Sequence, residues 1–166
     1  MQTRTMTLIL LLTCWGFVDH TAAAAETPET PWPCHLIAHA HLRPFIELGW
    51  THSATFRQQC LRLAAAQATV VLQGASATEV SWDAQSRIGK SADGLILAQV
   101  LVRHGRESIE VIAHELEHVL ERIDGEHPAF AASRSHSGAT AAGGAYETTR
   151  AIRAGQQVAR EVTRGR

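Results

Sequence analysis

The sequence has few aromatic residues, no excess of charge of either sign and no hydrophobic run long enough to cross a membrane. Aromatic side chains make up 5% of its 166 residues and tyrosine occurs once, which disfavours an all-β sandwich. Lys and Arg number 15 against 16 Asp and Glu, so the chain lacks the positive charge that attracts nucleic acid or anionic lipid. We expect neither partner. The hydrophobic content of 45%, rich in Ala, instead predicts one helix-rich α+β domain.

The first 25 residues have the three regions of a cleavable signal peptide. Met1–Thr7 carries one Arg and no acid, Leu8–Val18 is mainly apolar, and Thr21–Ala25 consists of small residues. The apolar run is shorter than the roughly 18 to 20 residues of a transmembrane helix, and no later run reaches that length. We therefore expect an exported protein, periplasmic or extracellular, with no transmembrane segment in the mature chain. A lipoprotein anchor at Cys14 is less favoured, because Thr13 is a poor residue before a lipid-modified cysteine.

The mature chain is expected to be a short leader followed by one domain. Residues 26–33 include three prolines, which withhold backbone donors and favour an extended leader. Residues 34–166 then form a single domain, which we expect to be a monomer. Cys34 and Cys60 are the cysteines left after cleavage, and in an oxidising compartment they predict one disulfide from the start of the domain to its first long helix.

Local patterns predict three helices and three strands in this domain. The best-supported helix has acids in its first turn and Gly125 just past its end, as the helix dipole and a left-handed terminal residue favour. In chain order the expected elements are a helix with a capping box at Thr55–Gln58 that runs to about Ala68, strands Thr69–Gln73 and Glu79–Trp82, a turn Ser91–Gly94, strand Leu95–Val102, helix Glu107–Ile123, a loop Pro128–Ala145 and a helix from about Tyr146 to Val162.

The helix expected at 107–123 contains the pattern HExxH at residues 114–118. His114 and His118 are four residues apart, slightly more than one turn, so both imidazoles project from one face and can bind the same metal ion. Glu115 lies about 100° further around the helix, too far to join them as a ligand but within reach of a water on that ion. A general base belongs at this position.

The apolar stripe of this helix lies away from the two histidines. At 100° per residue, both imidazoles fall well outside the stripe, so the helix can pack on a sheet with one side and line a cleft with the other. A plain solvated face would carry His and Glu in the same way. The predicted stripe consists of Ile109, Ile112, Ala113, Leu116, Leu120 and Ile123.

The third ligand has several candidates. Glu147 is favoured because it shares an inward strip of the last helix with Ala151 and Val158, and a buried acid needs a partner. Arg150 is the alternative partner for this carboxylate. A turn-back motif would need Gly at position 121, where the chain has Glu121; a straight helix puts that residue about 10 Å along the axis from the first histidine, so we expect it to line the cleft. Other candidates stay open: Asp124, His127 and His136.

These residues resemble the gluzincin branch of zinc metallopeptidases, in particular its very small members, and residues 112–125 are also similar to small exported bacterial proteins of this type. The resemblance rests on HExxH, the strand Leu95–Val102 and Glu147, and it covers roughly the last 75 residues. It implies a small zincin-like α+β domain with a short twisted mixed sheet, and a zinc-dependent metalloendopeptidase-like hydrolase acting on a peptide or protein. The segment before the strand matches only in the order of its elements.

Carried over residue by residue, the resemblance implies that His114, His118 and Glu147 bind Zn²⁺ and that Glu115 activates water. The backbone of an edge strand, near residues 99–102, would align the peptide. Members of this branch often place an Asp one turn after the ligand glutamate to orient a histidine, but this chain has Ala151 there. Tyr146, the only tyrosine, is a candidate for polarising a carbonyl, although packing explains it equally well.

Two further readings remain open at this point. An inactive relative would keep the same ligands for storage or structure, and a metal-free interaction module would simply expose HExxH to solvent. A second group of histidines, His35, His39 and His41, repeats the four-residue spacing and is more typical of a plain surface than of a second metal site.

Overall fold

The computed structural model describes residues 32–126, 139–142 and 145–165. The predicted signal peptide, most of the leader and the candidate ligands His127 and His136 lie outside these residues. Within them the chain is an α+β domain with a small mixed sheet, as the sequence predicts, and it has four α-helices and four strands in that sheet where three of each were expected. None of the described helices combines the length and hydropathy of a membrane span.

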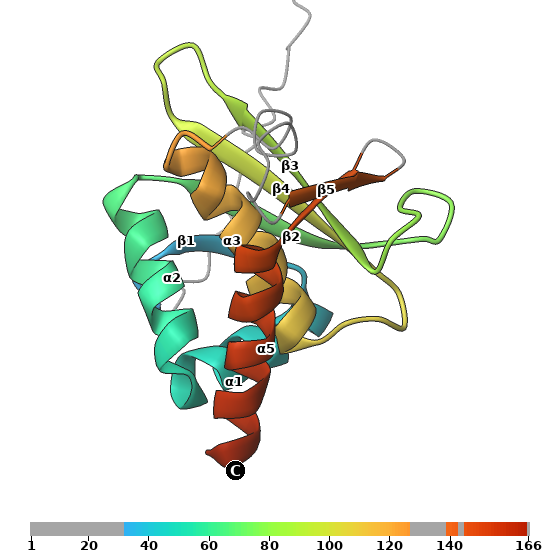
Figure 1. The fold of residues 1–166 in the computed structure, drawn as a ribbon. Coiled ribbons are helices and arrows are strands. Elements are labelled where there is room, and N and C mark those ends of the chain that lie inside the picture. Colours follow the sequence, from blue (N-terminus) through green and yellow to red (C-terminus); the bar gives the residue numbers. More distant parts are fainter. Residues whose placement is uncertain (1–31, 127–138, 143–144, 166) are drawn as a thin grey trace, which may run out of the picture.

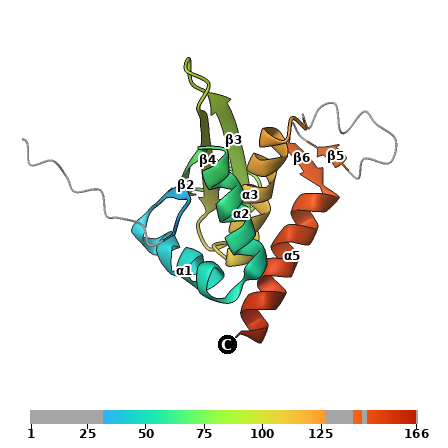
Figure 2. The same cartoon turned by 90° about the vertical axis from the view of Figure 1, so that its left-hand side faces the viewer.

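The chain runs from one strand through two helices into three further strands of the sheet, then through a central helix to a pair of short strands and a last long helix (Figure 1). Their bounds are β1 His35–Ala38, the 3₁₀ helix η1 Ala40–Leu42, α1 Arg43–His52, α2 Ala54–Ala65, β2 Thr69–Ala75, β3 Ala84–Lys90, β4 Ile96–Arg103, α3 Ile109–Ile123, β5 Ala139–Ala142, β6 Ala145–Thr148 and α5 Thr149–Arg164. Helix α3 packs on β3 and β4 and is flanked by α2 and α5 (Figure 2).

The four strands are ordered β1-β2-β4-β3, with β1, β2 and β4 parallel and β3 antiparallel to β4. The strand expected at Leu95–Val102 is β4, and it lies inside the sheet rather than at an edge. Its near-continuous burial from Val100 to Val102 is typical of an interior strand. The edge strands of this sheet are β1 and β3, so the expectation that the backbone near residues 99–102 forms an edge for peptide alignment is wrong.

Two predicted segments differ from the structure because a side chain hydrogen-bonds to the local backbone, in one case in a turn and in the other at the start of a helix. Glu79–Trp82 is not a strand: the Glu79 carboxylate accepts hydrogen bonds from the backbone N–H and hydroxyl of Ser76 at 2.8 and 2.7 Å and closes a turn. Helix α2 starts before the predicted capping box, because Ser53 accepts the Phe56 N–H at 3.0 Å.

The hydrophobic core lies between the sheet and the helices. Its α3 side confirms the predicted stripe, which is buried except at Ile123, and that residue is partly buried against the core. The largest fully buried side chains from the other elements include Leu36, Ile46, Phe56, Leu63, Val70, Leu72 and Val100. Because α3 is held along this whole stripe, the residues on its other side are presented on a rigid element.

Cys34 and Cys60 are both buried in this core as free thiols. They are neighbours, since a hydrogen bond with Cys34, followed by burial, raises the pKa of the Cys60 thiol. The structure thus brings together the start of β1 and the middle of α2, the two segments that the predicted disulfide joins. The disulfide itself stays a prediction.

Candidate functional site

Helix α3 presents His114 and His118 together on the side opposite its core stripe. The helix begins after Ser108, whose hydroxyl accepts the Val111 N–H at 3.1 Å, so the register of the pair is fixed locally. The two ring centroids are 4.9 Å apart and the rings are nearly perpendicular. Their side chains are 19% and 11% exposed, which leaves both edges open to a cleft.

Glu147 reaches this pair from β6, not from the last helix as the sequence analysis expected. The helix α5 cannot include Glu147, because the following residue, Thr148, is its N-cap and accepts the Ala151 N–H at 3.0 Å. One carboxylate oxygen of Glu147 lies 3.1 Å from Nε2 of His114 and 3.6 Å from Nε2 of His118. The three side chains therefore converge, although Glu147 comes from a strand and not from the expected helix, and metal binding by them stays a prediction.

The three donor atoms have a spacing that suits one metal ion. Nitrogen and oxygen ligands about 2.0–2.1 Å from a tetrahedral zinc ion lie roughly 3.4 Å from one another. The distances of 3.1 and 3.6 Å fall on either side of this value, and all three candidate ligand atoms lie within 4.8 Å of one another. His114, His118 and Glu147 could therefore hold a metal ion with small movements of their side chains.

The pKa shifts of the two imidazoles have opposite directions. Burial lowers the pKa of His114, against the attraction of Glu147, so the neutral form that a metal requires is favoured. Burial also acts to lower the pKa of His118, but the hydrogen bond to Glu121 and the nearby carboxylates outweigh it and raise the pKa. A positive charge in the cleft is thus favoured at His118, where a metal ion would replace the proton.

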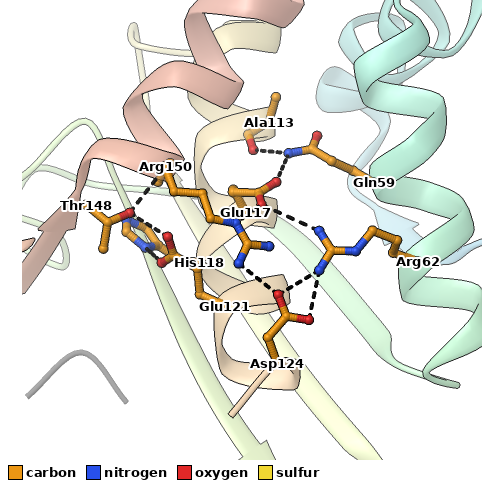
Figure 3. A network of polar contacts seen from close by, with 10 residues as sticks. Gln59, Arg62, Ala113, Glu117, His118, Glu121, Asp124, Thr148 and Arg150 are labelled. Atoms are coloured by element: carbon orange, nitrogen blue, oxygen red, sulfur yellow. Dashed lines mark hydrogen bonds and ion pairs between the residues drawn. The ribbon is translucent and has the colours of Figure 1, made fainter. Parts of the chain in front are cut away.

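Glu121 lies behind the second histidine and does not line the cleft as expected. Its side chain is nearly inaccessible, and its carboxylate is 2.9 Å from Nδ1 of His118 while it accepts the Thr148 hydroxyl at 2.6 Å (Figure 3). A carboxylate at Nδ1 keeps the proton there and turns Nε2 toward Glu147. Glu121 therefore orients His118. The sequence analysis looked for such an acid one turn after Glu147, where the chain has Ala151, and missed Glu121.

Glu115 is buried on the sheet side of the cleft and is 7% exposed. Burial raises the pKa of its carboxyl, against the charge of His118 and hydrogen bonds from the side chain and backbone of Ser86 on β3. The residue is not among the three converging ligand candidates. A buried carboxyl of raised pKa beside a pair of imidazoles is the kind of group that can accept a proton in a reaction.

The cleft that contains these groups has a volume of about 990 Å³. It is lined mainly by α3 and the edge strand β3, and the segment 81–83 also contributes to the lining. Tyr146 also lines the cleft, directly before Glu147 in the chain, and is partly buried. The edge strand β3 therefore borders the same space as HExxH, whereas β4 contributes Arg103 to the lining but is paired on both sides and has no free backbone edge.

Asp124, the alternative ligand, is engaged elsewhere. Its carboxylate accepts hydrogen bonds from Arg62 at 2.7 and 2.8 Å, and Arg150 lies 2.8 Å from it. Arg150 also donates to Glu117 at 2.6 Å, so it is not the partner of Glu147 (Figure 3). The structure thus separates an ion-pair network on one side of α3 from the converging histidines and Glu147 on another.

Comparisons with known proteins leave the family open: no protein-family model, no curated protein and no solved structure matches this chain.

Proposed function

We propose that this protein is an exported zinc-dependent hydrolase of peptide bonds, with His114, His118 and Glu147 as the zinc ligands. The observation that carries the proposal is the convergence of Glu147 from β6 on the HExxH pair, at 3.1 and 3.6 Å from the two Nε2 atoms. Three further features support a hydrolytic site: the buried Glu115, the orienting contact from Glu121 and a cleft large enough for an extended peptide.

The residues divide the chemistry among themselves. A bound zinc ion supplies a Lewis acid and an acidified water. Glu115 takes the proton of the attacking water and returns it to the departing amine. Glu121 keeps His118 in one orientation throughout, and Tyr146, which lines the same cleft, is a candidate donor to the substrate carbonyl.

The edge strand β3 supports a peptide as substrate. An edge strand carries backbone N–H and C=O groups that can pair with an added strand. In β3, Ala84, Gln85 and Ser86 border the cleft, and Ser86 also hydrogen-bonds to Glu115. A peptide paired with this edge would lie along the HExxH helix with its carbonyl groups near the proposed zinc site.

Metal analysis of the Glu147→Ala variant tests the ligand set. We expect the wild-type chain to bind one zinc ion in this cleft and the variant to lose at least about 100-fold in affinity, because one of three protein ligands is removed. Isothermal titration with zinc measures both the number of ions bound and the affinity. The matched control is Glu110→Ala, which removes a carboxylate from the same cleft but not from the converging group. Unchanged zinc binding in Glu147→Ala would disprove the ligand set.

Hydrolysis of an unfolded protein tests the reaction. The wild-type chain should cleave it, lose activity with a chelator and recover activity with added zinc. A chain that binds zinc through the same residues but cleaves no peptide would instead be a non-catalytic metal-binding relative.

The Glu121→Ala variant tests the orienting contact. Removal of the carboxylate frees the His118 ring and leaves the Thr148 hydroxyl without its acceptor, so we expect zinc affinity to fall about 10- to 100-fold. Glu126→Ala, an exposed acid just after the same helix, is the control. Equal zinc affinity in Glu121→Ala and wild type would show that packing alone holds the ring.

A further inference from the structure

A second cluster of side chains that could hold a metal ion lies at the carboxyl end of the parallel strands, and none of its members lines the cleft. His41 is in η1, which follows β1, while His104 and Glu107 lie between β4 and α3. The end of β2 lies between them, with Gly74 facing both imidazoles. The carboxyl edge of parallel strands is where side chains from separate connections meet and where ligands commonly bind.

Backbone hydrogen bonds to β2 place the two histidines. The N–H of His39 donates to Leu72 at 3.1 Å, which fixes the entry to η1, and the N–H of His104 donates to Ala75 at 2.9 Å. The imidazoles of His41 and His104 have centroids 5.8 Å apart. Two imidazoles bound at about 2.0–2.1 Å to one tetrahedral ion have centroids roughly 5 to 6 Å apart, so the pair already has a suitable spacing.

Glu107 completes the group from the connection just before α3. Its carboxylate accepts the N–H of Gly105 at 2.8 Å and lies 3.4 Å from Nδ1 of His104. Gly105 has a φ of +81°, a conformation that favours glycine and turns its N–H toward the carboxylate. One ligand atom from each of His41, His104 and Glu107 lies within 4.8 Å of the others.

Gly74 provides an independent indication, because a side chain there would occupy the space of both rings. A Cβ at position 74 would lie 2.4 Å from Cε1 of His104 and 2.8 Å from Nε2 of His41. The two imidazoles can thus converge over the backbone only because β2 has glycine at this point. Both are exposed to solvent and accessible to an ion.

We propose that His41, His104 and Glu107 form a second site for a divalent transition-metal ion, of the zinc class that imidazole and carboxylate ligands favour. Bound there, the ion ties η1 to the connection that leads from β4 into the HExxH helix. The site shares no ligand with the cleft, and the proposal stands whether or not the cleft binds zinc. It also changes the expectation for the amino-terminal histidines, of which His41 alone joins the described group.

Zinc titration of the full-length chain and its variants tests the second site. We expect His41→Ala and His104→Ala each to remove one equivalent of zinc relative to wild type, with unchanged circular dichroism. His39→Ala is the matched control, because its ring lies 6.1 Å from that of His41 but outside the group, and it should keep the full stoichiometry. If the cleft binds no zinc, the total falls from one to none instead of from two to one, so the two proposals fail separately.

Gly74→Ala tests the geometry without touching a ligand. We expect it to displace both exposed rings and to lower the zinc affinity of the second site at least about tenfold. Gly89→Ala, with open space around its Cβ position, should have no effect. The proposal is overturned if His104→Ala and His41→Ala bind as much zinc as wild type. It is also overturned if His39→Ala loses as much zinc as they do, since that result indicates unspecific surface histidines.

Discussion

Replacing Glu115 with Gln is expected to lower the rate of peptide hydrolysis by about 10²- to 10⁴-fold while zinc content stays unchanged. The amide of Gln has the shape of the carboxylate but cannot accept the proton of the attacking water. The residue is not part of the converging group of His114, His118 and Glu147, so the metal has no reason to leave. Gln can still hydrogen-bond to Ser86, which limits any structural effect.

Two assays on the same preparation separate the roles of Glu115. Zinc content is measured by elemental analysis, and hydrolysis is followed with an unfolded protein. Glu110→Gln, in the same cleft, should leave both unchanged. Full activity in Glu115→Gln would show that Glu115 is not the general base, whereas loss of zinc would indicate that Glu115 is a zinc ligand.

The part of the site that a single helix determines could be predicted from the sequence. His114 and His118 share one face because the helical repeat requires it, and the apolar stripe correctly showed which side packs on the sheet. Glu121 could have been found by the same reasoning. It is three residues after His118, a spacing that brings side chains together, but only its distance from the first histidine was considered.

Features that depend on long-range pairing were predicted less well. The segment expected to be a loop contains β5, which pairs with β6 and sets Glu147 just outside the last helix. Glu147 was chosen because it lay on an inward face, and it does converge on the histidines, but from a strand. Residues 99–102 were expected at an edge of the sheet, but β4 lies inside it. Its largely apolar sequence suits the interior position. Its neighbour β3 is determined by strand pairing that no local pattern specifies.

The Glu117→Ala variant is expected to lose about 2–4 kcal/mol of unfolding free energy, because it breaks a buried ionic network. Glu117 is 6% exposed and accepts hydrogen bonds from Gln59 at 2.8 Å and Arg150 at 2.6 Å, with Arg62 at 3.6 Å (Figure 3). Without Glu117, the side-chain amide of Gln59 loses a buried hydrogen-bond acceptor. The two guanidinium groups are about one-third exposed, so water offsets part of the cost.

Asp124→Ala is the matched control for this measurement. Asp124 contacts the same two arginines, but its side chain is 35% exposed, so we expect a loss below about 1 kcal/mol. Urea unfolding with a chelator present compares the variants without any contribution from metal. Equal losses in the two variants would show that charge, and not burial, determines the strength of the network.

The Glu117 network should also affect zinc binding, although none of its members is a proposed ligand. Thr148 donates to Glu121 and Arg150 donates to Glu117, so the two contacts fix the chain just after Glu147 to α3 at two points. Loss of the second contact lets the β6–α5 junction move relative to the histidines. We therefore expect zinc affinity to fall about tenfold or more in Glu117→Ala and to stay near wild type in Asp124→Ala, in line with the effect of groups that position metal ligands. If only stability falls, the carboxylate of Glu147 is placed by the hairpin and the Thr148 contact alone.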